Sequence, residues 1–145
     1  QSREGSSLSA SQGWRKAMKR LDLCDLIVRR RKLQRTLPTS FEAAERGGIH
    51  LELGVLAKLL DGPEGIERAF FHLRAALELL PDELTSERQR ALFVLGLTHG
   101  DVSQPEAAVE RFEEVNALDE QTAAGSAARA YARAYRDHFS MRATG

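Results

Sequence analysis

Apolar residues recur at helical spacing in six segments of this 145-residue chain, and Gly, Pro or polar residues separate one segment from the next. Apolar residues three or four positions apart lie on one face of a helix, whereas a half-buried strand needs strict alternation of apolar and polar residues. No alternation of any length occurs. Ala, Leu, Glu and Arg, which favour helices, dominate the composition. We therefore predict an all-α fold of about six helices, packed as antiparallel hairpins because the connections are short.

The length suits one domain with one continuous core. Helix starts are indicated by Ser or Thr three residues before Glu or Gln, which is the spacing of a capping box. The three pairs are Ser9 with Gln12, Thr39 with Glu42, and Ser86 with Gln89. The predicted organisation is a disordered segment 1–8 and a single helical domain 9–141, which comprises a basic N-terminal helix 9–36, two hairpins 39–121 and a capping helix 122–139.

Charge is distributed unevenly along the chain, although the formal net charge is zero. Residues 1–40 hold ten Lys or Arg and three Asp or Glu, whereas the remaining residues hold eleven and eighteen. The basic part either pairs with the acidic body, which we favour, or forms an exposed arm for an anionic partner. Five basic residues within seven positions form a patch suited to the phosphates of nucleic acid or acidic lipid. They are Arg29, Arg30, Arg31, Lys32 and Arg35.

Small residues recur at matching places in two parts of the chain. Gly96 is followed by Ala108 and Phe112, and Gly54 is followed by Ala69. In two packed helices, Gly and Ala let the backbones approach closely, and a large side chain such as Phe112 fills the wedge beside them. This pattern resembles the tetratricopeptide repeat. Ala69 and Ala108 are 39 residues apart, whereas a standard repeat has about 34, so the predicted repeats are degenerate or separated by an insertion.

The resemblance extends over roughly residues 45–122 and implies hairpins stacked as a short superhelix. A leading helix, two hairpins and a closing helix are also similar to the cytosolic domain of the organelle fission adaptor Fis. The N-terminal helix here is longer and more basic than in that family, and no counterpart of its membrane anchor is found in the sequence. A plain helical bundle, in which the same small residues belong to an ordinary core, is the alternative to repeat-like stacking.

In the repeat family, the first helix of each hairpin lines a concave groove. The resemblance places Leu51, Val55, Arg90, Phe93 and Leu97 in such a groove. It is mainly apolar, and Arg90 is the nearest candidate for the donors that a bound carboxylate needs. An apolar groove suits an amphipathic helix, which would come from a protein or peptide partner, from a second copy in a homo-oligomer, or from the chain's own N-terminal segment. Alternatively, Phe93 and Leu97 simply face the core.

The function predicted from these features is a non-catalytic adaptor or scaffold for protein binding. Two other functions stay open. The basic patch allows an anion-binding protein that uses the N-terminal helix on RNA, DNA or an acidic membrane surface. The helical pattern also allows a self-associating structural protein.

The sequence offers no arrangement suited to catalysis. The four histidines lie on different predicted helices and lack the spacing of a metal site; they are His50, His72, His99 and His138. No glycine-rich phosphate loop occurs. Cys24, the only cysteine, is expected to be buried and unreactive. We therefore expect no enzymatic activity, no cofactor and no metal, and a cytoplasmic or cytosol-facing location because no signal peptide or membrane span is apparent.

Overall fold

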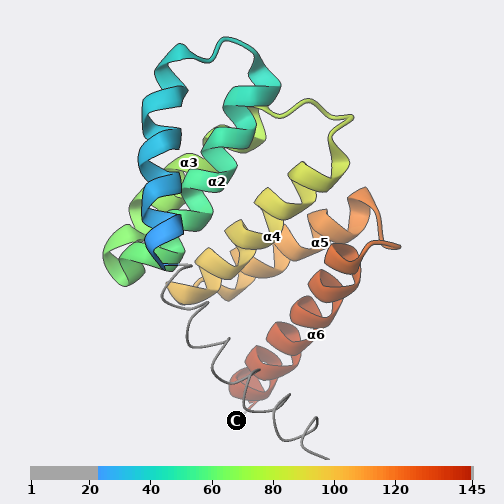
Figure 1. Ribbon diagram of the computed structural model, residues 1–145. Helices are drawn as coiled ribbons and strands as arrows, with labels where there is room; N and C mark the ends of the chain where they lie inside the picture. The colour runs from blue at the N-terminus through green and yellow to red at the C-terminus, as the bar shows by residue number, and fades with distance from the viewer. Residues whose placement is uncertain (1–22, 145) are drawn as a thin grey trace, which may run out of the picture.

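The computed structural model describes residues 23–144, and every element in this range is helical (Figure 1). A first helix occupies residues 23–36. It is followed by η1 (Leu37–Thr39), α2 (Ala43–Asp61), η2 (Gly62–Gly65), α3 (Ile66–Leu79), α4 (Thr85–Asp101), α5 (Pro105–Leu118) and α6 (Ala123–Thr144). No strand occurs within the described range, so the prediction of an all-α fold is confirmed. The predicted disordered segment 1–8 and the Ser9–Gln12 capping box lie outside it.

From α2 onward, consecutive helices run in opposite directions and pack against each other (Figure 1). Two further contacts join helices that are two places apart, α2 with α4 and α4 with α6. In Figure 1 these three helices form a front row, with α3 and α5 behind it. The fold therefore consists of two antiparallel hairpins, α2 with α3 and α4 with α5, followed by α6.

Three apolar clusters hold the helices together. The first joins α2, α3 and α4, the second joins α4, α5 and α6, and the third attaches the 23–36 helix to α2. Their buried members are, in this order, Leu51, Ala57, Ala69, Leu73, Ala76, Leu80, Ala91 and Leu95; Leu92, Ala108, Phe112, Val115, Ala128 and Ala132; and Leu33, Ile49, Leu53 and Leu56. Because α4 contributes to the first two clusters, it links one hairpin to the other.

Both hairpins contain a close approach between helices at a glycine. A Cβ atom on Gly54 would lie 2.8 Å from Cγ of Leu73, and a Cβ atom on Gly96 would lie 2.7 Å from Cε1 of Phe112. Both distances are shorter than real Cβ atoms tolerate, so a side chain at either position would displace the facing side chain or the helix that carries it. Gly96 was predicted to play this part opposite Phe112, and the contact confirms it.

The start of α2 differs from the prediction. The helix begins at Ala43, without a side-chain cap, and Thr39 belongs to the short 3₁₀ turn η1 that contains Pro38. The Thr39 hydroxyl donates to the Thr36 carbonyl oxygen at 2.8 Å, and Thr39 lies three residues before the N-cap residue Glu42, outside the first turn of α2. The hydroxyl of Ser40 instead donates to the Glu45 carboxylate at 2.9 Å. The Thr39–Glu42 capping box is therefore wrong.

The start of α4 also corrects the prediction, because Ser86 and Gln89 form no capping box. Gln89 is buried, and its amide nitrogen donates to the backbone carbonyl oxygens of Val115 at 3.0 Å and Asp119 at 2.8 Å. Its amide oxygen accepts a hydrogen bond from the Thr122 hydroxyl at 3.1 Å. Gln89 thus satisfies the end of α5 and the turn into α6 and ties them to α4.

Candidate functional site

The predicted groove residues fall into two groups. Leu51 is buried in the first cluster, among Ala69 and Leu73 of α3, so its assignment to a groove is wrong. Val55 is only partly buried and packs against the same cluster. Leu59, one helical turn beyond Val55, has 63% of its surface exposed. The exposed strip of α2 therefore runs through Val55 and Leu59, and the sequence analysis missed Leu59.

The predicted groove residues of α4 lie along one side of that helix. Phe93 and Leu97 are partly buried and pack against the second cluster, and Arg90 is exposed. The ring centroid of Phe93 lies 5.6 Å from that of Phe112 and 5.6 Å from that of Tyr131 on α6. Phe93 was predicted either to line a groove or to face the core. It does both in part, since it touches the core and also reaches the surface beside Tyr131.

These residues lie on adjacent helices and form what we call the α2–α4–α6 face, which consists of Val55, Leu59, Arg90, Phe93, Leu97 and Tyr131. Tyr131 has 43% of its surface exposed and extends the apolar character onto α6. One end of the face is held by an ion pair between Lys58 of α2 and Asp101 of α4, with Nζ and Oδ2 2.6 Å apart. The face therefore combines an apolar middle with a charged end.

The 23–36 helix is docked on α2 beside this face. Its Leu33 is buried against Ile49, Leu53 and Leu56. Arg29 forms a bidentate ion pair with the Glu52 carboxylate, in which its Nε and Nη2 atoms each donate a hydrogen bond of 2.9 Å. The hydrogen bonds and the charge of Glu52 raise the pKa of Arg29.

A second ion-pair group lies at the end of α2. Nη1 of Arg30 donates to both carboxylate oxygens of Asp61, at 2.8 and 2.7 Å, and Nη2 of Arg68 donates to Oδ2 at 2.8 Å. Hydrogen bonds from Arg30 and then from Arg68 lower the pKa of Asp61. The favoured pairing of the basic N-terminal part with the acidic body is therefore present at Arg29 and Arg30.

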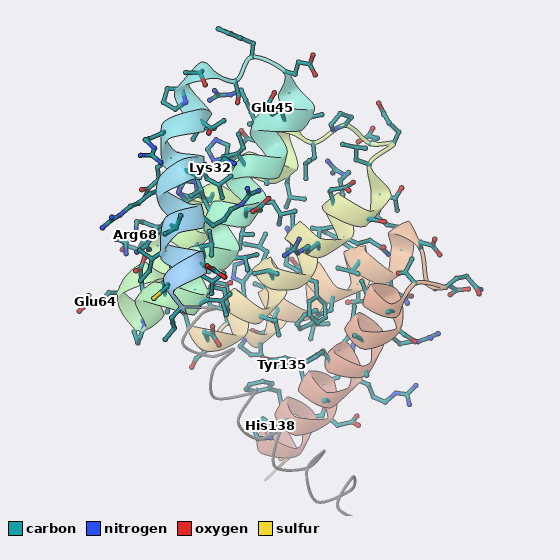
Figure 2. The ribbon with its side chains drawn as sticks, in the orientation of Figure 1. Lys32, Glu45, Glu64, Arg68, Tyr135 and His138 are labelled. Carbon is teal, nitrogen blue, oxygen red and sulfur yellow. The ribbon has the colours of Figure 1, made fainter. Side chains whose placement is uncertain are left out.

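The predicted basic patch does not act as one unit. Arg29 and Arg30 are engaged with α2, whereas Arg31, Lys32 and Arg35 are exposed and make no ion pair within the described residues. A hollow of about 320 Å³ lies between the 23–36 helix and α2, and its lining includes Lys32 and Glu45, both labelled in Figure 2. Cys24 is exposed, which corrects the expectation that it would be buried.

His50 and His72, which were not predicted to meet, are paired between α2 and α3. The Nδ1 atoms of His50 and His72 lie 2.9 Å apart, so one ring donates and the other accepts. Burial, followed by the charges of His50 and Arg68, lowers the pKa of His72 to about 4. Burial and the charge of Arg46 lower the pKa of His50. The pair is therefore held in its neutral form.

Another hollow, of about 380 Å³, lies between α5 and α6 and was not predicted. Its apolar lining includes Val109, Phe139 and Tyr135, the last of which is labelled in Figure 2. Glu106 and Glu110 also belong to its lining. It is separate from the α2–α4–α6 face, since it opens on the α5 side of α6.

Between residues 23 and 140, no group of three or more His, Cys, Asp or Glu side chains is placed to hold a metal ion. None of the helices in the described part of the chain has the length and apolar character needed to cross a bilayer. Comparison with protein-family models, with curated proteins and with solved structures gave no match.

Proposed function

We propose that this chain is a non-catalytic protein-binding module that holds an amphipathic helix of a partner on the α2–α4–α6 face. The observation that carries the proposal is the exposure of Leu59 and Tyr131 beside the partly buried Val55 and Leu97 on three adjacent helices. Contiguous apolar surface of this kind is typical of interaction sites.

The chemistry of the face favours a helix over an extended, charged peptide. Arg90 is its one predicted donor for a carboxylate, and the other residues of the face are apolar or aromatic. An amphipathic helix buries apolar residues at spacings of three and four, and it suits such a row of side chains. Acidic residues at the rim of the bound helix would meet Arg90.

The arrangement of the helices supports a tetratricopeptide-like interpretation of the fold. Packing of α2 with α4 and of α4 with α6, in addition to sequential neighbours, is what stacked hairpins produce. The equivalent glycine contacts at Gly54 and Gly96 also fit a repeated unit. An adaptor or scaffold role in the cytosol is part of this proposal.

The proposal is tested by comparing capture of partners from native extract by three forms of the chain. Leu59→Asp places a charge on the face, and Phe71→Asp places the same charge at an equally exposed position on α3, since both side chains are 63% exposed. We expect proteins that are retained by the wild type and by F71D to be lost from L59D. Cross-linking from a photoreactive residue at Leu97 then identifies the bound segment. Retention of the same proteins by a folded L59D variant would exclude this face as the site.

A further inference from the structure

The outward side of the 23–36 helix carries a second, different kind of surface. It is formed by Leu23, Cys24, Ile27, Val28, Arg31 and Arg35, which we call the outer strip. Leu23, Ile27 and Val28 have 54%, 39% and 63% of their surface exposed. Helical spacing places the two arginines on the same side, one and two turns beyond these apolar residues. The strip is therefore apolar toward residue 23 and cationic toward residue 35.

The cations of this helix are divided according to the direction in which they point. Arg29 and Arg30 face α2 and are neutralised by Glu52 and Asp61. Arg31 and Arg35 face away from α2, are exposed, and have no ion pair among the described residues. Docking of the helix thus pairs Arg29 and Arg30 with carboxylates and leaves a positive potential on the outer strip. Such a potential favours an anionic partner.

The apolar residues of the strip decide which anionic partner fits. Contact with the phosphates of a nucleic acid would use Arg31 and Arg35 but would leave Ile27 and Val28 in water. The interface of an anionic bilayer takes both, because apolar side chains enter the boundary between headgroups and acyl chains while the cations meet lipid phosphates and carboxylates. The sequence that precedes the strip also combines an apolar side chain with cations, since Trp14 lies among four basic residues.

We propose that the outer strip binds the surface of an anionic lipid bilayer, with the 23–36 helix lying in the plane of the interface. Leu23, Ile27 and Val28 enter the interface, and Arg31 and Arg35 contact the lipid headgroups. The inference does not depend on the proposed function, since the α2–α4–α6 face is formed by other residues and would remain open to a partner.

The single cysteine allows a direct test, because Cys24 lies within the strip and is exposed. The full chain, labelled at Cys24 with an environment-sensitive dye, is mixed with vesicles of phosphatidylcholine alone or with one quarter phosphatidylserine. Unlabelled protein is followed in parallel by co-sedimentation. We expect a blue shift of the dye and co-sedimentation only with the phosphatidylserine vesicles, and weaker binding at higher salt.

Two variants separate the charged and apolar contributions. R31Q/R35Q should weaken vesicle partitioning about 30-fold, since each basic residue at an anionic surface contributes about a fivefold factor. The matched control R129Q/R133Q removes two exposed arginines of α6 and should bind as the wild type does. V28Q removes apolar surface without a charge and should weaken binding about tenfold. Circular dichroism and thermal unfolding verify that each variant is folded.

Three results would overturn the proposal. Unchanged vesicle binding by V28Q would show that the apolar residues do not enter the interface. Binding of single-stranded RNA, without binding to phosphatidylserine vesicles, would assign the arginines to nucleic acid. A blue shift of the dye that grows with protein concentration in the absence of vesicles would assign the strip to contact with a second copy.

Discussion

Lowering the pH from 7.5 to 5.0 should destabilise the protein through the His50–His72 pair. The pKa of His72 is about 4 in the folded protein, against an ordinary value of 6.5. The fold therefore favours the neutral imidazole. The stability that depends on this residue is complete above pH 6.5 and is lost as the pH falls from 6.5 toward 4, because the unfolded chain takes up the proton first.

Linkage gives the size of the effect. Between pH 7.5 and 5.0, a shift from 6.5 to about 4 lowers the free energy of unfolding by about 2 kcal/mol. Protonation of both rings would place hydrogens on two Nδ1 atoms that lie 2.9 Å apart, which removes the hydrogen bond. His50, whose pKa is also lowered, adds to the loss in the same direction.

The assay is urea unfolding followed by circular dichroism at both pH values, for the wild type and two variants. H72Q removes the partly buried imidazole and should reduce the loss between the two pH values by about 2 kcal/mol. H138Q, which removes an exposed histidine on α6, is the matched control and should keep the wild-type dependence. If H72Q loses as much stability between the two pH values as the wild type, the pair is not the cause and the reasoning fails.

Three further predictions concern the packing of the helices and the buried hydrogen bonds between them. Gly96→Ala should lower the free energy of unfolding by about 1–3 kcal/mol because its Cβ would meet the Phe112 ring. Gly48→Ala should raise the free energy of unfolding by about 0.5–1 kcal/mol, because its Cβ would meet nothing within 4 Å. The urea midpoints of the two variants compare them directly. Leu33→Ala should cost about 2–5 kcal/mol and release the 23–36 helix, which limited proteolysis would reveal as early cleavage near residue 40; a wild-type digestion pattern would contradict this. Gln89→Ala should cost about 1–3 kcal/mol, and thermal unfolding indistinguishable from the wild type would show that its buried hydrogen bonds are dispensable.

Local patterns in the sequence were sufficient to predict much of the fold. Proline suits the first turn of a helix, and α5 begins at Pro105. The close approach at Gly96 was predicted because glycine on one helix and a large side chain on the next are both visible in the sequence. The two capping boxes within the described residues failed for different reasons. Thr39 lies in η1, before the start of α2, and the buried amide of Gln89 donates to carbonyl oxygens at the end of α5.

The candidate site was less predictable because α2 carries apolar residues on almost every side. It packs on the 23–36 helix through Leu53, on α3 through Leu51, and it exposes Leu59. A helix of this kind has no single apolar face from which its orientation can be inferred. Contacts such as His50 with His72 depend on how two helices are placed, and residue spacing carries no signal for them.

The layout of the contacts also determines how a local change spreads. Extensive packing among α2 to α6 is confined to helices one or two places apart in the chain. Stability in such a stack is close to a sum of terms between neighbours, so the pieces can open separately. Because α4 contributes Ala91 and Leu95 to one cluster and Leu92 to the next, it sets the cooperativity between the hairpins. Hydrogen exchange should therefore report one unfolding unit while the packing of α4 on both clusters is intact, and two units when that packing is weakened.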